Sequence, residues 1–357
     1  MPKEINQFFE KIAEVYRLKQ PFVVYRKPNE ELVTLMVQNS LKLNKLHSFN
    51  EAGFLFAPFY KEDAKILFPK EESSIFQMRI SQYEELAINE NILSKKINSL
   101  SSNSKENYVD LINKAIEFIK ENNAQKIVLS RNEVVEFSHF SFITSLKKML
   151  KNYTNAFVYA WFHPKVGLWL GATPERLLTI TNGNFKTMAL AGTQFYNNSV
   201  NVVWEEKEKE EQKIVTDFII DNIKNEVNIT EVNGPYTVKA GSLLHLRTDI
   251  SGELTNVQML EKLLLKLHPT PAVCGLPKEV ALNFILSNEH YKRTYYAGYL
   301  GELNLSTSTQ LFVNLRCMEI QNKYAKIFVG GGITKDSVSD KEYDETVFKT
   351  MIMKNVL

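Results

Sequence analysis

The chain has 357 residues, of which 44% are hydrophobic and 24% charged, and this composition excludes a disordered or fibrous protein. Its 43 basic and 41 acidic residues leave a net charge of +2 without a cluster of lysine and arginine, so nucleic acid is not an expected partner. The N-terminus has no signal-peptide pattern, no apolar run approaches the ~20 residues that span a bilayer, and two cysteines cannot form a disulfide framework, so we expect a cytoplasmic protein that does not bind membranes.

The first 100 residues predict a small mixed region. Apolar residues at helical spacing indicate a helix at 5–16, and short apolar runs indicate strands at 22–25, 32–37 and 53–59. Residues 92–105 are rich in Ser, Asn and Lys and indicate a linker or mobile loop. We expect residues 1–100 to be an α/β portion that is integrated into one fold with residues 101–357.

The rest of the chain predicts many short strands interrupted by a few long helices. Helices are expected at 108–121, 202–223 and 340–355, and strands at 127–135, 156–162, 166–170, 177–180, 186–190, 298–305, 310–320 and 323–329. This order of elements favours an α+β fold with large antiparallel β-sheets.

Two of the expected helices carry carboxylates at helical spacing. Glu342 and Glu345 are three residues apart and Lys349 follows four later, so all three project from one face. Glu208 and Glu211 repeat the three-residue spacing in the earlier helix. Each pair could bind Mg²⁺, which prefers oxygen ligands, or could belong to a solvated surface. Lys207 and Lys209, which alternate with the glutamates, are typical of an exposed, soluble helix.

Three further segments carry residues that could contact an anion. Three glycines at 330–332 follow an apolar run, and they indicate either a tight turn or a backbone nest for a carboxylate or phosphate. Arg316 is expected inside an apolar strand, where a guanidinium needs an anionic partner. Lys126 begins another apolar strand, for which a surface position is the ordinary reading. Three prolines and a glycine at 267–277 predict a fixed wall.

Together these segments resemble the chorismate-binding enzymes, and most closely the isochorismate synthases. The resemblance runs from about residue 108 to the C-terminus, and its motifs occur in family order: KIVLSR, LGATPERLL, ALAGT, the acidic helix with Glu211, LLHLRTDISGEL, HPTPAVCGLP, YYAGYLGEL, FVNLRCMEI and VGGGITKDSVSDKEYDET. It implies a central sandwich of antiparallel sheets with helices packed outside, and a chorismate-binding catalytic region at 101–357.

The resemblance assigns roles to the matching residues. It implies that Mg²⁺ is the cofactor, held by Glu211, Glu342 and Glu345 and supported through water by Glu208, and that the ion grips the ring carboxylate of chorismate. It also implies a set of substrate contacts: Gly192, Thr193, His245, Ala272, Tyr296, Arg316, Gly330, Gly332 and Lys349.

Two residues are implied as the catalytic pair. Lys126 matches the general base that activates water for attack at ring C2, and Glu175 matches the acid that protonates the departing C4 hydroxyl. The carboxyl must therefore stay protonated at neutral pH, and burial in a closed pocket has this effect.

The choice within the family depends on the proline-rich segment. Ala272 stands where ammonia-using relatives and salicylate synthases carry Thr, which favours an isomerase that makes isochorismate, for menaquinone or siderophore synthesis, with menaquinone the expected use. The alternatives are a salicylate synthase, or the large subunit of an anthranilate or aminodeoxychorismate synthase. We expect a monomer that needs no glutaminase subunit.

Overall fold

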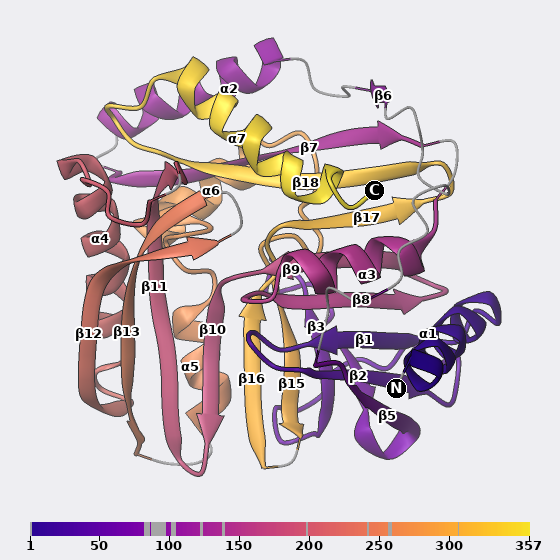
Figure 1. Ribbon diagram of the computed structural model, residues 1–357. Coiled ribbons are helices and arrows are strands. Elements are labelled where there is room, and N and C mark those ends of the chain that lie inside the picture. The colour runs from indigo at the N-terminus through magenta and orange to yellow at the C-terminus, as the bar shows by residue number, and fades with distance from the viewer. Residues whose placement is uncertain are drawn as a thin grey trace.

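Two large antiparallel β-sheets form the framework of the chain (Figure 1). The computed structural model describes residues 2–81, 86, 98–100, 105–121, 124–137, 140–197, 199–240, 243–255, 259–305 and 307–357. These sheets with flanking helices confirm the predicted α+β fold. The linker expected at 92–105 lies outside the described residues, apart from a short strand at 98–100 and the first residue of a helix.

The first sheet has ten strands. Along its path the order is β14 (Gly275–Leu276), β7 (Lys126–Glu136), β18 (Tyr324–Ile333), β17 (Cys317–Gln321), β9 (Gly167–Thr173), β8 (Phe157–His163), β1 (Phe22–Arg26), β2 (Leu32–Gln38) and β5 (Ser73–Arg79), and β6 (Asn98–Leu100) pairs with β7.

The second sheet has eight strands, and in Figure 1 its strands run across those of the first. Their order is β12 (Val227–Ala240), β13 (Leu243–Leu254), β11 (Asn184–Phe195), β10 (Arg176–Thr181), β16 (Ser308–Val313), β15 (Tyr299–Leu305), β3 (Gly53–Ala57) and β4 (Ile66–Pro69).

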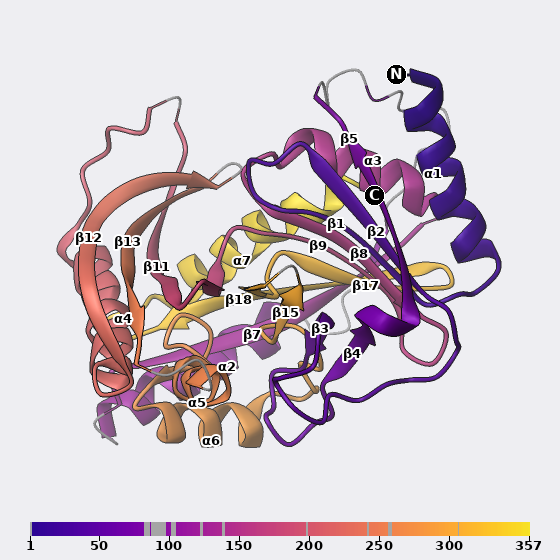
Figure 2. The same ribbon diagram turned by 90° about the horizontal axis from the view of Figure 1, so that it is seen from below.

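Helices cover the outer surfaces of both sheets. Figure 2 shows α1 and α3 together on the outside of the first sheet, and α7 lying along β18. The helices are α1 (Pro2–Arg17), α2 (Lys105–Glu121), α3 (Phe142–Asn152), α4 (Glu206–Ile223), α5 (Leu260–Leu267), α6 (Lys278–Asn288) and α7 (Ser339–Lys354), with a short 3₁₀ turn, η1 (Lys70–Glu72). None of the helices in the described ranges is long and apolar enough to cross a membrane.

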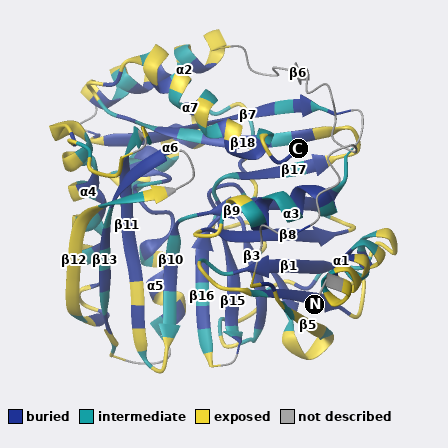
Figure 3. Ribbon diagram, viewed as in Figure 1, coloured by how far each residue is buried: buried dark blue, intermediate teal, exposed yellow. Residues whose placement is uncertain are grey.

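Strand β8 illustrates why the centre of the first sheet is buried on both faces. Its residues are all buried, and successive side chains point to opposite faces. Phe157 and Trp161 join the core between the two sheets, whereas Val158 and Phe162 join the core under α1 and α3. The central strands therefore appear dark in Figure 3, and the outer edge at β12 is largely exposed.

One expected strand, 310–320, is divided in the structure. β16 belongs to the second sheet and β17 to the first, because β16 pairs with β10 and β15 while β17 pairs with β9 and β18. Arg316 lies in the connection with a φ of 48°, a left-handed conformation that interrupts a strand. The prediction that Arg316 lies inside a strand was therefore wrong. The helix expected from residue 202 begins at Glu206 instead.

Candidate active site

A single cavity between the two sheets collects the residues that the sequence singles out. It is bounded by β7 and β18 of the first sheet, β11 and β13 of the second, and helices α4 and α7. Every predicted site residue lines it: Lys126, Glu175, Gly192, Thr193, Glu208, Glu211, His245, Ala272, Tyr296, Arg316, Gly330, Gly332, Glu342, Glu345 and Lys349. These residues come from distant parts of the sequence, so the fold alone brings them together.

Lys126 begins β7 and is buried rather than at the surface. Its side chain is only 2% exposed, and Nζ lies 2.6 Å from Oε1 of Glu211 on α4. Gly332 in the neighbouring strand β18 leaves room for this contact, because a Cβ there would lie 2.5 Å from Cε of Lys126. A residue larger than glycine would thus push the amine out of place.

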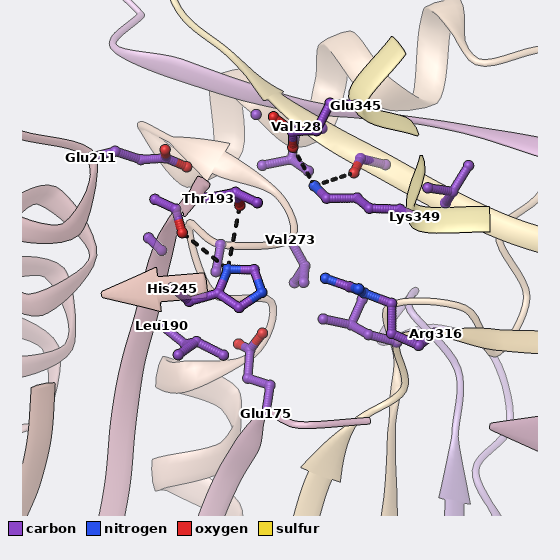
Figure 4. A pocket seen from close by; sticks show the side chains of 18 of the residues that line it. Val128, Glu175, Leu190, Thr193, Glu211, His245, Val273, Arg316, Glu345 and Lys349 are labelled. Carbon is purple, nitrogen blue, oxygen red and sulfur yellow. Dashed lines mark hydrogen bonds and ion pairs between the residues drawn. The ribbon is translucent and has the colours of Figure 1, made fainter. Parts of the chain in front are cut away.

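Glu175 lies in the turn between β9 and β10, and it points into the cavity (Figure 4). The turn is fixed because Thr173 Oγ1 donates to the carbonyl of Val313 and the Val313 amide donates to the carbonyl of Glu175. Burial raises the pKa of the Glu175 carboxyl to about 8, although the positive charges of Lys126 and Arg316 oppose the shift. A pKa of about 8 keeps the carboxyl mostly protonated at neutral pH, as a group that donates a proton requires.

His245 lies on β13 beside an irregularity in β11. Gly192 has a φ of 71°, and the β11 register shifts there, so that the Gly192 carbonyl oxygen lies 3.0 Å from Nδ1 of His245. Burial and the charge of Arg316 lower the pKa of His245 to about 3. The ring is neutral, with Nδ1 donating to Gly192, and the buried Nε2 has no partner among the described residues. That nitrogen can accept a hydrogen bond from a ligand.

The acidic residues of α4 and α7 meet at the same cavity. Glu342 accepts hydrogen bonds from Ser337 Oγ at 2.7 Å and from Nζ of Lys207 at 3.2 Å. Glu345 lies 2.5 Å from Nζ of Lys349, which also donates to the carbonyl of Gly330. Burial lowers the pKa of Lys207, but Glu342, Glu211 and Glu345 outweigh it and the pKa is raised overall.

The donors of this acidic cluster fit a hard divalent cation. Four glutamates of α4 and α7 line the cavity, and Oε2 of Glu208 is buried without a hydrogen-bond partner in the described part of the chain. Carboxylate oxygens are the ligands that Mg²⁺ takes in proteins. Within the described ranges, however, no three such groups converge as a ready site. Glu211, Glu342 and Glu345 each contact a lysine instead.

The other side of the cavity suits an anion. Arg316 extends into it (Figure 4) and has no ion-pair partner among the described residues. The glycines at 330–332 belong to β18, and their registers oppose 128–130 of β7. The predicted tight turn or backbone nest was therefore wrong, because this backbone lies in a paired strand. What the glycines contribute is space, since a Cβ at Gly330 would lie 2.9 Å from the hydroxyl of Tyr296.

Two features of the site were not predicted from the sequence. Lys207 was interpreted as a solubilising charge, yet it bonds to the buried Glu342. Behind the cavity, the buried guanidinium of Arg293 donates to the carbonyls of Val128 and Val273 and pairs with Glu289. The four-residue spacing of Glu289 and Arg293 was the available signal, but it does not separate a buried pair from a surface pair.

Gln212 follows Glu211 on α4, and its buried side chain connects the helix to the second sheet. Its Nε2 donates to the Ala189 carbonyl of β11 and to Oγ1 of Thr248 on β13. The side chain thereby ties α4 to the second sheet one residue after Glu211.

Comparisons with known proteins agree with this site. A family model described as "Chorismate binding enzyme" matches residues 61–357. Isochorismate synthase MenF of Bacillus subtilis is 30% identical over 265 residues, which cover 71% of this chain and 56% of that protein. Anthranilate synthase component 1 of Lactococcus lactis is 26% identical over 293 residues, covering 78% and 64%. The chain thus matches only about half to two thirds of the length of these curated relatives.

Solved structures share the fold. A putative 2,3-dihydroxybenzoate-specific isochorismate synthase, DhbC from Bacillus anthracis, has a TM-score of 0.80 at 22% identity, covering 98% of this chain and 99% of that one. MenF from Escherichia coli, titled as the menaquinone-specific isochorismate synthase, has a TM-score of 0.79 at 20% identity, covering 94% and 88%.

Proposed function

The chain belongs to the chorismate-binding enzyme family, and we propose that within it the protein is an isochorismate synthase, an isomerase that interconverts chorismate and isochorismate. The proposal depends on the presence of a lysine and a protonated glutamic acid in one cavity. Lys126 and Glu175 both line it, and burial raises the pKa of Glu175 to about 8.

In the proposed reaction, water supplies one hydroxyl group and another leaves as water. Lys126 in its neutral form takes a proton from a water whose oxygen bonds to ring C2. The ring double bonds shift, and the C4–O bond breaks as Glu175 donates its proton to the departing hydroxyl. Because Nζ of Lys126 lies 2.6 Å from Glu211, this contact must open before the amine can act as a base. General acid–base pairs of this kind contribute about 10²- to 10⁴-fold each.

The charges of the cavity suit a dianion that binds together with a divalent cation. His245 and Glu175 are uncharged at neutral pH. Before Lys126 gives up its proton, the remaining charges balance, with four cations, Lys126, Lys207, Lys349 and Arg316, and four carboxylates, Glu208, Glu211, Glu342 and Glu345. Chorismate carries two carboxylates, so chorismate and Mg²⁺ together preserve the balance, whereas either one alone leaves a net charge in a partly buried site.

We propose Mg²⁺ as the cofactor, held by Glu211, Glu342 and Glu345 with Glu208 in support. When bound, the ion supplies Lewis-acid polarisation of the ring carboxylate. The enolpyruvyl carboxylate is assigned to Arg316, which extends into the cavity and forms no ion pair in the described part of the chain. Tyr296, Gly330 and Lys349 line the same side, and His245 offers an acceptor for a ring hydroxyl.

Ala272 supports water chemistry that stops at isochorismate. It lines the cavity next to Val273, and its methyl group provides no hydroxyl at the position where ammonia-using and salicylate-forming relatives carry threonine.

We propose that the enzyme acts as a cytoplasmic monomer without a glutaminase subunit and that its product supplies menaquinone synthesis. Complementation of strains that lack either the menaquinone or the siderophore isochorismate synthase distinguishes the two uses.

The test is a product assay. The purified protein is incubated with chorismate and Mg²⁺, with and without ammonium, and the products are separated by chromatography. The proposal predicts isochorismate alone under both conditions, and no turnover by Lys126→Ala. Salicylate with pyruvate, or an aminated product with ammonium, would instead identify one of the alternative activities.

A further inference from the structure

Each of the three proposed metal carboxylates contacts a different lysine. Glu211 is 2.6 Å from Lys126, Glu342 is 3.2 Å from Lys207, and Glu345 is 2.5 Å from Lys349. The lysines come from β7, α4 and α7. Among the described residues, the fourth carboxylate, Glu208, has an unpartnered buried oxygen, Oε2.

We propose that these lysines are exchangeable counter-ions: they neutralise the carboxylates in the metal-free protein and are displaced by Mg²⁺, with Lys207 setting the affinity for the metal. This inference rests on the magnesium site of the proposed function. Three like charges around one cavity repel each other in the absence of a cation. The lysines remove that repulsion, and they also compete with the ion for the same oxygens.

Lys207 is the residue at which the competition between lysine and Mg²⁺ can be measured separately from catalysis and substrate binding. Lys126 and Lys349 are assigned to the reaction and the substrate, so their replacement would change several properties at once. Lys207 has no such assignment, and its side chain is 44% exposed, against 2% and 13% for the other two. It reaches from α4 to Glu342 of α7, so it connects the two acidic helices across the proposed metal position.

The choice of variant follows from this geometry. Lys207→Met keeps most of the side-chain length and removes the charge, leaving Glu342 with the Ser337 hydroxyl and without an ammonium partner. The metal then competes with one lysine fewer for the carboxylate oxygens, and the carboxylates repel each other more strongly when no metal is bound. Lys209→Met is the matched control, because Lys209 lies on the same helix and pairs at 3.6 Å with Glu206, which is 87% exposed.

The experiment measures Mg²⁺ binding by titration calorimetry and the thermal midpoint of the metal-free protein. Lys207→Met is expected to bind Mg²⁺ roughly 5- to 10-fold more tightly than wild type and to unfold at a lower temperature without metal. Lys209→Met is expected to match wild type in both. Lys207→Gln, which can still donate a hydrogen bond to Glu342, separates the loss of charge from the loss of contact and is also expected to bind more tightly.

The outcomes separate this inference from the proposed function. Unchanged or weaker Mg²⁺ binding by both Lys207 variants, with measurable binding by wild type, would overturn the counter-ion role and leave the proposed enzyme intact. An absence of Mg²⁺ binding by wild type, with or without chorismate, would instead remove the metal from the proposed function and this inference with it.

Discussion

At the scale of single residues, Glu175 has the clearest consequence for pH. Its pKa is raised from 4.5 to about 8, so between these values the folded chain keeps a proton that the unfolded chain has lost. The free energy of unfolding therefore falls as the pH rises through this window, by up to about 1.4 kcal/mol per pH unit. Glu175→Gln removes this contribution.

Unfolding in urea at several pH values, for wild type and Glu175→Gln, measures the difference. The two proteins should have similar stability near pH 5, and wild type should become progressively less stable than the variant toward pH 8. Parallel pH profiles would contradict the buried, protonated carboxyl. The variant should also lose at least about 10²-fold in turnover, because the amide cannot donate the proton.

Gly332 gives a steric prediction about the lysine. A Cβ there would lie 2.5 Å from Cε of Lys126 and 3.2 Å from Oε1 of Glu211, so Gly332→Ala should displace the amine. A misplacement of about 1 Å can reduce turnover by about 10²-fold. Gly331→Ala in the same strand is the control, because among the described atoms its Cβ would meet only Glu342 Oε2 within 4 Å, at the ordinary contact distance of 3.8 Å. Steady-state kinetics of the two variants measure the difference in turnover. Equal activity of Gly332→Ala and Gly331→Ala would show that Lys126 tolerates the added methyl group.

Single residues were also the level at which the sequence was most informative about the site. The family motifs identified every residue that is proposed to bind the metal or the substrate, and these residues line one cavity in the structure. Spacing alone left Glu342 and Glu345 undecided between a solvated face and a metal site, because it does not say what lies opposite. Lys207 was misinterpreted for the same reason, since its partner Glu342 is 135 residues away.

At the scale of elements, the buried pair of Arg293 and Glu289 joins three segments behind the cavity. Their side chains are 0% and 1% exposed, and Glu289 also accepts from the backbone amide of Ser130 on β7. Removing one member of such a pair leaves an uncompensated buried charge, so Arg293→Met should lower the free energy of unfolding by about 3–5 kcal/mol. Urea denaturation of both proteins measures the change.

The exposed pair of Arg79 and Glu31, 3.1 Å apart, provides the control. Arg79→Met should change stability by less than about 1 kcal/mol. Similar small effects at both sites would mean that the Arg293 pair is dispensable. If the interpretation is correct, the double variant Arg293→Met/Glu289→Met should be more stable than Arg293→Met, because it no longer buries a lone carboxylate.

Helices and strands were predicted correctly where the local pattern of apolar residues determines them. The predictions were wrong where strand pairing within the two sheets determines the structure. Most expected helices and strands were found, because apolar periodicity is local. The segment 310–320 reads as one apolar strand, yet the chain changes sheets at Arg316. The glycines at 330–332 suggested a turn or a backbone nest, but they lie in β18, where a Cβ at Gly330 or Gly332 would collide with Leu129 or Lys126 of β7.

At the scale of the whole molecule, the N-terminal strands take part in both sheets. β1 pairs with β8 in the first sheet, and β3 pairs with β15 in the second. We therefore predict that a chain of residues 101–357 will not fold alone, because both sheets would lose strands and expose apolar faces. Circular dichroism and thermal unfolding of this truncation test the prediction; a cooperative transition near that of the full chain would show that the first 100 residues are separable.

Deletion of residues 2–17, which form α1, is the matched comparison. This helix packs on the outer face of the first sheet and contributes no residue to the cavity. The shortened chain should be less stable and still bind ligands.

The sequence predicted an α+β class of fold from the order of elements, but it could not show which strands pair, because these contacts join residues more than 100 positions apart.

If the cavity exchanges a ring hydroxyl with water, the oxygen that enters the product comes from the solvent, and isotopic labelling detects it. Chorismate is incubated with the protein and Mg²⁺ in H₂¹⁸O, and the products are analysed by mass spectrometry at early times. Wild type should give isochorismate with one ¹⁸O at C2, and Glu175→Gln should give no labelled product. Unlabelled isochorismate, or none at all from wild type, would contradict this exchange.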